Sequence, residues 1–173
     1  RAGELLLVHG ASGGTGAAAV QLGRHLGARV IATGTSAERL APLRALGAEL
    51  VLTTGDGFRD SVKAASGGRG ADVIFDPVGG DVFDESVHCI APDGRLLVVG
   101  FSSGRFASVA TNRVLIKSFS VVGVRAGEYL RNHLEQAPGI VATLAALPDQ
   151  GLMRPLIGAR FALAQALDAL HTL

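Results

Sequence analysis

The sequence contains little cysteine and no long apolar run. Cys89 is the single cysteine among 173 residues, which rules out an internal disulfide and a zinc site built from several cysteines. No segment approaches the roughly 20 consecutive apolar residues that a membrane-spanning helix needs. The first residues show no signal-peptide pattern. We therefore expect no membrane partner and a cytoplasmic location.

The sequence also lacks an excess of either charge. Its 16 Lys and Arg residues and 15 Asp and Glu residues give a net charge of +1, and the two signs are interspersed along the chain. Such a balance does not favour nucleic acid or a membrane surface as a partner. Hydrophobic residues make up 48% of the chain, which predicts one globular domain with a sizeable core.

Short runs rich in Val, Ile and Leu alternate with helix-length segments. Because these runs lack strict apolar–polar alternation, they are typical of parallel strands covered by helices on both faces. We predict strands at Glu4–His9, Arg29–Thr33, Glu49–Leu52, Ala71–Asp76, Gly94–Val99 and Ser118–Val124. We predict helices at Thr15–Leu26, Ala37–Leu46, Asp60–Ala65, Asp81–Cys89, Glu128–Leu147 and Leu163–Leu170. This order predicts an α/β Rossmann fold with a doubly wound, mostly parallel six-stranded sheet. Pro42 should kink or restart the second helix.

Glycine is concentrated where the first predicted strand meets the first predicted helix. The segment His9–Gly16 reads His-Gly-Ala-Ser-Gly-Gly-Thr-Gly and is followed by three alanines. Gly13 and Gly14 would let a dinucleotide pyrophosphate approach the amides of a helix N-terminus, where the helix dipole favours anions. Gly16 would let the helix pack close to the strands. Because Ala11 replaces the first glycine of the G-x-G-x-x-G fingerprint, a tight connection without a ligand is the alternative.

The segment after the second predicted strand bears on the choice between NAD and NADP. NAD-selective domains place an Asp or Glu at the end of this strand to hold the ribose hydroxyls, and no acid stands there. We predict that Ser36 and Arg39 bind the 2′-phosphate of NADP. Glu38 could serve NAD, but Thr35 and Glu38 have the spacing of a capping box, which gives Glu38 a structural role. A solvated helix residue is the alternative role for Arg39.

Two reductase superfamilies use such a glycine-rich turn, and the presence or absence of a catalytic tyrosine distinguishes them. Short-chain dehydrogenases need a Tyr-x-x-x-Lys pair, in which the lysine helps the tyrosine to donate a proton. The single tyrosine here is Tyr129, and His133 follows it at that spacing. The short-chain interpretation therefore lacks its chemistry.

Several blocks together carry a resemblance to a different superfamily. They are residues 3–16 (GELLLVHGASGGTG), 21–22 (QL), 46–48 (LGA), 68–80 (GRGADVIFDPVGG) and 91–101 (APDGRLLVVGF). These blocks resemble the zinc-free quinone oxidoreductases, the zeta-crystallin-like branch of the medium-chain dehydrogenase/reductase family. The similarity covers nearly the whole chain.

The resemblance implies NADP(H) as the cofactor and contacts along the strand ends. The residues that would bind the cofactor are Ser12, Gly13, Gly14, Thr15, Thr35, Ser36, Arg39, Thr54, Val78, Gly79, Gly100, Phe101, Ser102, Gly123 and Val124. Thr54 has a shorter side chain than the tyrosine or histidine that relatives often carry there. Plain core packing is the alternative role for Phe101 and Val124.

The resemblance also implies direct hydride transfer from the nicotinamide to an electron-poor small molecule, such as a quinone or an enone. The protein would supply orientation and a dry site, so we assign no catalytic residue. The five histidines show no metal-ligand spacing with Cys89, and we expect no metal. Two alternatives remain. One is an enoyl-thioester reductase module of a polyketide or fatty-acid synthase, which usually carries Asn-Ser-Leu at the position of Asp76-Pro77-Val78. The other is a non-catalytic NADPH-binding module.

Finally, the resemblance implies a separate substrate domain that this chain does not contain. Residues 1–173 are therefore expected to be the cofactor-binding part of a longer enzyme and to be inactive alone. Residues 154–173 resemble the segment that leads back toward the substrate domain, and Leu156–Phe161 should be less ordered than the core. Relatives pair the edge strand Phe119–Val124 with its copy in a second subunit, which implies a homodimer. An edge covered by the helix near Glu128 is the alternative.

Overall fold

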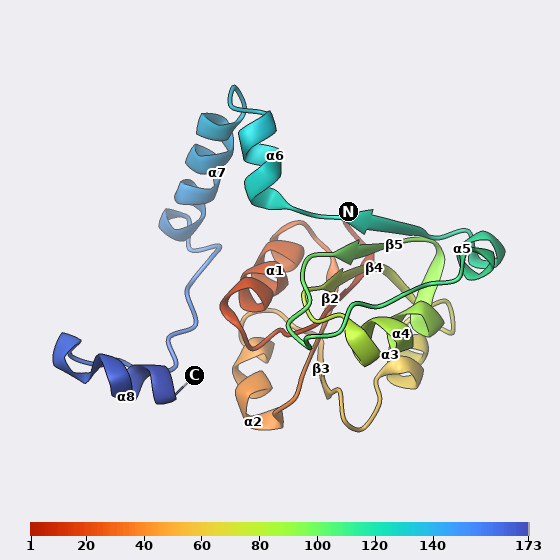
Figure 1. Ribbon diagram of the computed structural model, residues 1–173, viewed down its shortest axis with the longest axis horizontal. Helices are drawn as coiled ribbons and strands as arrows, with labels where there is room; N and C mark the ends of the chain where they lie inside the picture. Colours follow the sequence, from red (N-terminus) through yellow and green to blue (C-terminus); the bar gives the residue numbers. More distant parts are fainter. Residues whose placement is uncertain (173) are drawn as a thin grey trace.

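Six parallel strands form the centre of the molecule (Figure 1). The computed structural model describes residues 1–172, and Leu173, the last residue of the predicted domain, lies outside the described residues. The strands are β1 (Leu5–Val8), β2 (Arg29–Gly34), β3 (Leu50–Thr53), β4 (Ala71–Asp76), β5 (Ile90–Val98) and β6 (Ser120–Gly123). Their order is β3-β2-β1-β4-β5-β6, and every pairing is parallel. The predicted doubly wound Rossmann sheet is confirmed.

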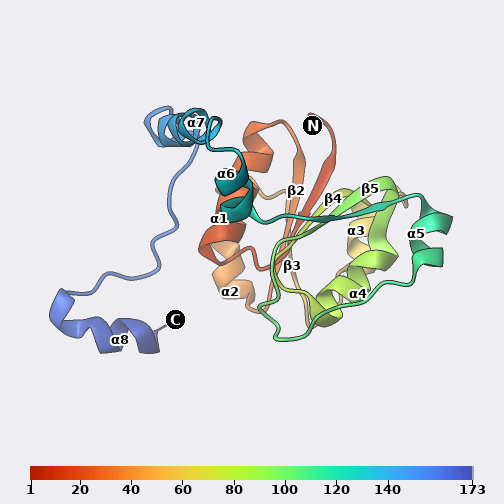
Figure 2. The ribbon, with the colours of Figure 1, turned by 45° about the horizontal axis from the view of Figure 1, so that its top comes forward.

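Helices cover both faces of this sheet. The described residues form the helices α1 (Gly14–His25), α2 (Ala37–Leu40), α3 (Arg59–Ala65), α4 (Gly80–Cys89), α5 (Thr111–Lys117), α6 (Ala126–Asn132), α7 (Ala137–Asp149) and α8 (Ala166–His171), with short 3₁₀ helices at Ala41–Arg44 and Leu163–Gln165. Figure 2 shows α1 and α2 on one side of the strands and α3 and α4 on the other. No helix among residues 1–172 is long and apolar enough to cross a membrane.

Two apolar cores result from this arrangement, because successive side chains of a strand point to opposite faces. Leu7 of β1 packs in one core with Val62 of α3 and Phe83 of α4. Val8, the next residue, packs in the other core with Val20 of α1. All five side chains are buried. Burial on both faces explains why the strands appear in the sequence as continuous apolar runs.

Proline explains how the helices differ from prediction. The restart predicted at Pro42 is confirmed, since α2 ends at Leu40 and a 3₁₀ helix follows. The single helix predicted at Glu128–Leu147 is wrong, because α6 ends at Asn132 and α7 begins at Ala137. Pro138 stands in the first turn of α7, where its missing N–H is tolerated; inside a continuous helix it would break a hydrogen bond.

Two further elements differ from the sequence-based expectation. The helix α5 was not predicted; its Leu115 and Ile116 are both strongly exposed, so its pattern lacks a buried apolar face. Strand β5 begins at Ile90 rather than at Gly94. Ile90 pairs with Ala71 ahead of a shift in register between β4 and β5, which lengthens the strand.

The C-terminal third of the chain lies largely outside the sheet layers. Figure 1 shows α6, α7 and α8 projecting from the core, with an irregular segment between α7 and α8. The side chain of Gln21 on α1 contacts this segment twice: its Nε2 donates to the carbonyl of Arg154 at 2.9 Å, and its Oε1 accepts from the Arg154 N–H at 2.7 Å. Beyond this tether Leu156–Phe161 is exposed, and its expected lower order stays a prediction.

Candidate functional site

The predicted cofactor-binding residues all lie at one edge of the sheet. Because the strands are parallel, their carboxyl ends meet at this edge, which is where ligands bind in doubly wound folds. Each predicted residue either ends a strand or lies in the segment that follows one. The structure therefore brings together segments that are separated by more than a hundred residues in the sequence.

The turn between β1 and α1 is closely packed against the start of the helix. A Cβ atom on Gly16 would lie 2.4 Å from the carbonyl oxygen of Gly10 and 2.6 Å from the Cα of Ala11, so only glycine fits there. Gly14, by contrast, begins α1 with no atom within 4 Å of an added Cβ. Gly16 therefore allows α1 to begin close to the backbone of the turn that follows β1. The open position at Gly14 leaves room for an anion at the helix N-terminus.

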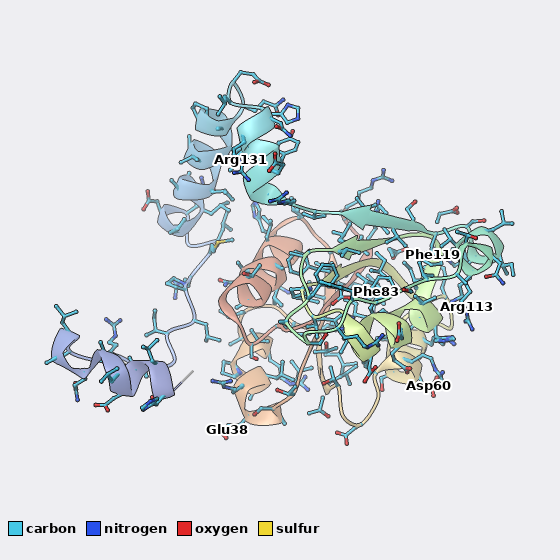
Figure 3. The ribbon with its side chains drawn as sticks, viewed as in Figure 1. Glu38, Asp60, Phe83, Arg113, Phe119 and Arg131 are labelled. Carbon is cyan, nitrogen blue, oxygen red and sulfur yellow. The ribbon has the colours of Figure 1, made fainter. Side chains whose placement is uncertain are left out.

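The end of β2 differs from prediction in its helix cap. The capping box predicted for Thr35 and Glu38 is wrong: Ser36 is the N-cap of α2, and its Oγ accepts the Arg39 N–H at 3.3 Å. The sequence offers two adjacent hydroxyl residues, and spacing alone did not distinguish them. The Ser36 hydroxyl keeps its own hydrogen for a further acceptor, because the cap bond uses only its oxygen. Glu38 lies on the outer side of α2 (Figure 3).

An open cavity of about 1090 Å³ lies beside this cap. Ser36, Glu38 and Arg39 line one wall, while Leu156–Ala159 and residues of α8 line the other. Most of the second wall is apolar, and the first wall is polar and charged. Ser36 and Arg39 thus lie together on the same cavity, as a shared 2′-phosphate site requires. Thr35 is exposed nearby but does not line the cavity.

Thr54 follows β3 at the same edge, but its polar groups face the neighbouring strand. Its N–H donates to the carbonyl of Gly34 at 2.9 Å, and its hydroxyl donates to the same oxygen at 3.4 Å. These bonds hold the ends of β2 and β3 together. A cofactor contact by Thr54 stays a prediction.

The segment after β4 is ordered by Asp76, a buried carboxylate that sequence reasoning did not single out. Its Oδ1 accepts the N–H groups of Val78 at 2.8 Å and Gly79 at 2.9 Å, whereas its Oδ2 has no partner among the described atoms. Burial raises the pKa of Asp76, and the two N–H donors act in the opposite direction. Gly79 adopts a φ of +70°, a conformation that favours glycine. Asp76 therefore holds the backbone of Val78 and Gly79, two of the residues predicted to bind the cofactor.

The loop after β5 is anchored against this segment. Arg105 forms ion pairs with Asp81 and Asp84 of α4, at 2.8 and 2.5 Å. Phe101 packs edge-to-face on Phe106, with 4.8 Å between ring centroids. Phe101 is 44% exposed and Val124, after β6, is 36% exposed, so the core-packing alternative is wrong for both. Gly100, Ser102 and Gly123 lie at the same strand ends.

A second buried polar group lies under the glycine turn. His9 is fully buried; its Nδ1 lies 2.6 Å from the Thr33 hydroxyl and its Nε2 lies 2.8 Å from the Ser86 hydroxyl. Its ring also packs against Phe58, at 4.9 Å between centroids. Burial lowers the pKa of His9 from 6.5 to about 3, so the ring is neutral at physiological pH.

The lowered pKa of His9 makes stability depend on pH. The unfolded chain takes up a proton below pH 6.5 that the folded chain refuses until about pH 3, so folding is weakened as the pH falls through this window. Between pH 7 and pH 5 the loss should be about 2 kcal/mol. We predict that urea unfolding of His9→Gln lacks this loss. The contribution of Asp76 has the opposite sign and is common to both proteins, so it cancels in the comparison.

The control is His25→Gln, which removes an exposed histidine at the end of α1. It should keep the pH dependence of the unmodified chain. If the unmodified chain and His9→Gln lost the same stability between pH 7 and pH 5, the neutral buried state of His9 would be wrong.

Comparison with known proteins places the chain in a family. A family model described as "Zinc-binding dehydrogenase" matches residues 14–143. The chain belongs to the zinc-binding dehydrogenase family. The resemblance to the quinone oxidoreductase branch, carried by the glycine turn and the later blocks, is thereby confirmed.

Relatives within this family cover the chain almost completely. Quinone oxidoreductase-like protein 2 of Mus musculus is 37% identical over 99% of this chain and 50% of its own length. The mycoketide-CoA synthase of Mycobacterium tuberculosis is 36% identical over 90% of this chain and 4% of its own length. The solved structure of the mycobacterial protein Rv1454c in complex with NADPH is 29% identical over 99% of this chain and 53% of its own, with a TM-score of 0.84. The chain thus spans about half the length of the quinone oxidoreductase-like relatives that it matches.

The family name refers to zinc, but the residues present do not fit a zinc site. No group of three or more His, Cys, Asp or Glu side chains within residues 1–172 is placed to hold a metal ion. Burial raises the pKa of the Cys89 thiol to about 12, which disfavours the thiolate that zinc binds. Cys89 is fully buried and packs in the apolar core. Zinc therefore has no part in the chemistry derived below.

Proposed function

We propose that this chain binds NADP(H) as the cofactor-binding part of an oxidoreductase that transfers hydride to a quinone or another electron-poor carbonyl or alkene. The observation that carries the proposal is the glycine turn, where Gly16 packs against the turn backbone and Gly14 leaves open space at the start of α1. The NADPH complex of Rv1454c and the mouse quinone oxidoreductase-like relative support it.

In this proposal the chain's own residues bind and orient the cofactor. The N–H groups at the start of α1 hold the pyrophosphate, and the absence of an acid at the end of β2 leaves Ser36 and Arg39 to hold the 2′-phosphate. The segments fixed by Asp76 and Arg105 lie beside the nicotinamide half. NADPH, when bound, supplies the hydride. A substrate domain in the longer protein covers the nicotinamide and excludes water.

An enoyl-thioester reductase is the second candidate. The mycoketide-CoA synthase relative favours it, because a region of that protein aligns with 90% of this chain. The segment Asp76-Pro77-Val78 favours the quinone branch, because enoyl-thioester reductase modules usually carry Asn-Ser-Leu at this position.

Substrate competition in a longer protein that contains this chain and a substrate domain tests the proposal. With NADPH as the reductant, we expect kcat/KM for menadione to exceed that for crotonyl-CoA by at least about tenfold, a difference of about 1.4 kcal/mol in transition-state binding. The reverse order would establish the enoyl-thioester reductase instead. NADPH binding without turnover of either substrate would leave a non-catalytic binding module.

We further propose that the enzyme is a homodimer paired through β6. All four residues of β6 are exposed, so the alternative in which the helix near Glu128 covers this strand is wrong. Val121 and Val122 are each 39% exposed on the edge of the sheet. An apolar edge strand with unpaired backbone groups is a template for pairing with a second copy.

Sedimentation of the unmodified chain and of Val121→Lys tests this pairing. The unmodified chain should sediment as a dimer, and Val121→Lys as a monomer, because a charge at the edge opposes strand addition. Val141→Lys, at an exposed position of α7, is the matched control and should remain dimeric. A monomeric unmodified chain would contradict the proposal.

A further inference from the structure

The hydrogen-bond directions of the buried His9 cluster are determined by its neighbours. Ser86 donates its hydroxyl hydrogen to the carbonyl of Val82 at 2.7 Å, which leaves its oxygen to accept. The partner nitrogen of His9, Nε2, must therefore carry the ring hydrogen and donate to Ser86. The other nitrogen, Nδ1, then accepts from the Thr33 hydroxyl. In this arrangement both ring nitrogens of His9 and the hydroxyl groups of Thr33 and Ser86 all form hydrogen bonds.

The two bonds of His9 join three elements that each lead into a predicted cofactor-binding segment. His9 itself directly precedes the glycine turn. Thr33 belongs to β2, whose end leads to the cap residue Ser36. Ser86 belongs to α4, which begins directly after Gly79. The imidazole ring therefore lies where side chains connect the glycine turn, the predicted 2′-phosphate segment and the predicted nicotinamide segment.

An apolar core would not require this cluster. Three polar side chains with no exposed surface are costly to bury unless all are paired, and apolar side chains in place of all three would fill the same space without that cost. What a fully paired polar network adds is one specified arrangement of the elements that it joins. The backbone bond from the Ala11 N–H to the Thr33 carbonyl, at 2.9 Å, ties the glycine turn to the same residue of β2.

We propose that His9 is a positioning residue that sets the two halves of the cofactor site relative to the glycine turn, through separate bonds. The Thr33 bond positions the segment that meets the adenosine 2′-phosphate. The Ser86 bond positions the segment beside the nicotinamide. The inference rests on the proposed function, because it assigns each bond to one half of the dinucleotide.

Single-bond deletions in this chain separate the two roles. Thr33→Val removes the hydroxyl at nearly constant shape, and Ser86→Ala removes the other hydroxyl. NADPH, NADH and adenosine 2′,5′-bisphosphate are titrated by calorimetry, and thermal unfolding is recorded for each variant. Thr33→Val should lower the ratio of NADPH affinity to NADH affinity at least fivefold and weaken the bisphosphate equally. Ser86→Ala should weaken NADPH and NADH by one common factor and leave bisphosphate binding within twofold.

Substitutions of His9 provide an independent check. His9→Asn keeps an acceptor near the position of Nδ1 but does not reach Ser86, so it should behave like Ser86→Ala. His9→Gln reaches toward Ser86 but loses the Thr33 bond, so it should behave like Thr33→Val. Thr33→Ser keeps the hydroxyl and should restore the native affinity ratio, a rescue that is independent of any loss in stability.

The outcomes distinguish this proposal from the proposed function. A Thr33→Val ratio within twofold of native, with NADPH still bound by the unmodified chain, would overturn the positioning role alone. The positioning role would also be overturned if each variant lost affinity for all three ligands only in proportion to the fall in its unfolding temperature. Failure of the unmodified chain to bind either dinucleotide would overturn the proposed function and this inference with it.

Discussion

Replacing Gly16 by alanine is expected to destabilise the chain by about 1–3 kcal/mol and to lower NADPH affinity at least about tenfold. The added Cβ would meet the carbonyl oxygen of Gly10 at 2.4 Å and the Cα of Ala11 at 2.6 Å. Both are backbone atoms, which cannot rotate away as a flexible side chain could. Helix α1 must therefore move away from the turn, and its N–H groups move with it. Thermal unfolding and calorimetry measure the two effects.

The matched control is Gly139→Ala in α7. An added Cβ at Gly139 meets no atom within 4 Å, and the position lies in a regular helix. We expect stability within about 0.5 kcal/mol of native or slightly above it, since alanine favours the helix, with unchanged NADPH affinity. If Gly16→Ala matched this control in both measurements, the close packing at the turn would not be required for binding.

Replacing Arg39 by alanine is expected to lower NADPH affinity by about 10- to 100-fold, which corresponds to about 1.5–3 kcal/mol for one charge-assisted contact. Arg39 is exposed on α2 and lines the same cavity as Ser36. NADH lacks the 2′-phosphate, so its affinity should change little. A loss of affinity for NADPH alone indicates a contact with the 2′-phosphate, because a nonspecific effect of removing the charge would lower the affinity for both dinucleotides.

Arg44→Ala removes the same charge from an exposed position in the following 3₁₀ helix. It should leave both affinities near native. Equal losses for NADPH and NADH in Arg39→Ala, or the same loss in Arg44→Ala, would place the 2′-phosphate elsewhere.

The sheet could be predicted because its signal is local. Runs such as Leu5–Val8 and Val30–Ala32 are apolar over their whole length, since both faces of each strand are covered. The split between α6 and α7 was also visible in principle, because Pro138 stands at the break. The helix cap at Ser36 could not be predicted, since the neighbouring Thr35 also carries a hydroxyl group that can cap a helix. Only the backbone conformation decides between the two residues.

The buried polar groups could not be predicted from the sequence, because their partners are distant along the chain. His9 meets Ser86 across 77 residues of sequence, and no spacing rule connects them. Asp76 was seen as part of a family block, but its bonds to Val78 and Gly79 depend on the turn that it shapes. The sequence predicted segments for cofactor binding that the structure brings to one edge of the sheet. The side chains that hold those segments together required the structure.

Calorimetric titration of the unmodified chain with NADPH and with NADH tests the central claim most directly. The absence of an acid at the end of β2, together with Ser36 and Arg39 on one cavity, predicts NADPH binding at least about tenfold tighter than NADH binding. NADH binding as tight as NADPH binding, or tighter, would contradict the account and would assign Glu38 to the ribose hydroxyls instead.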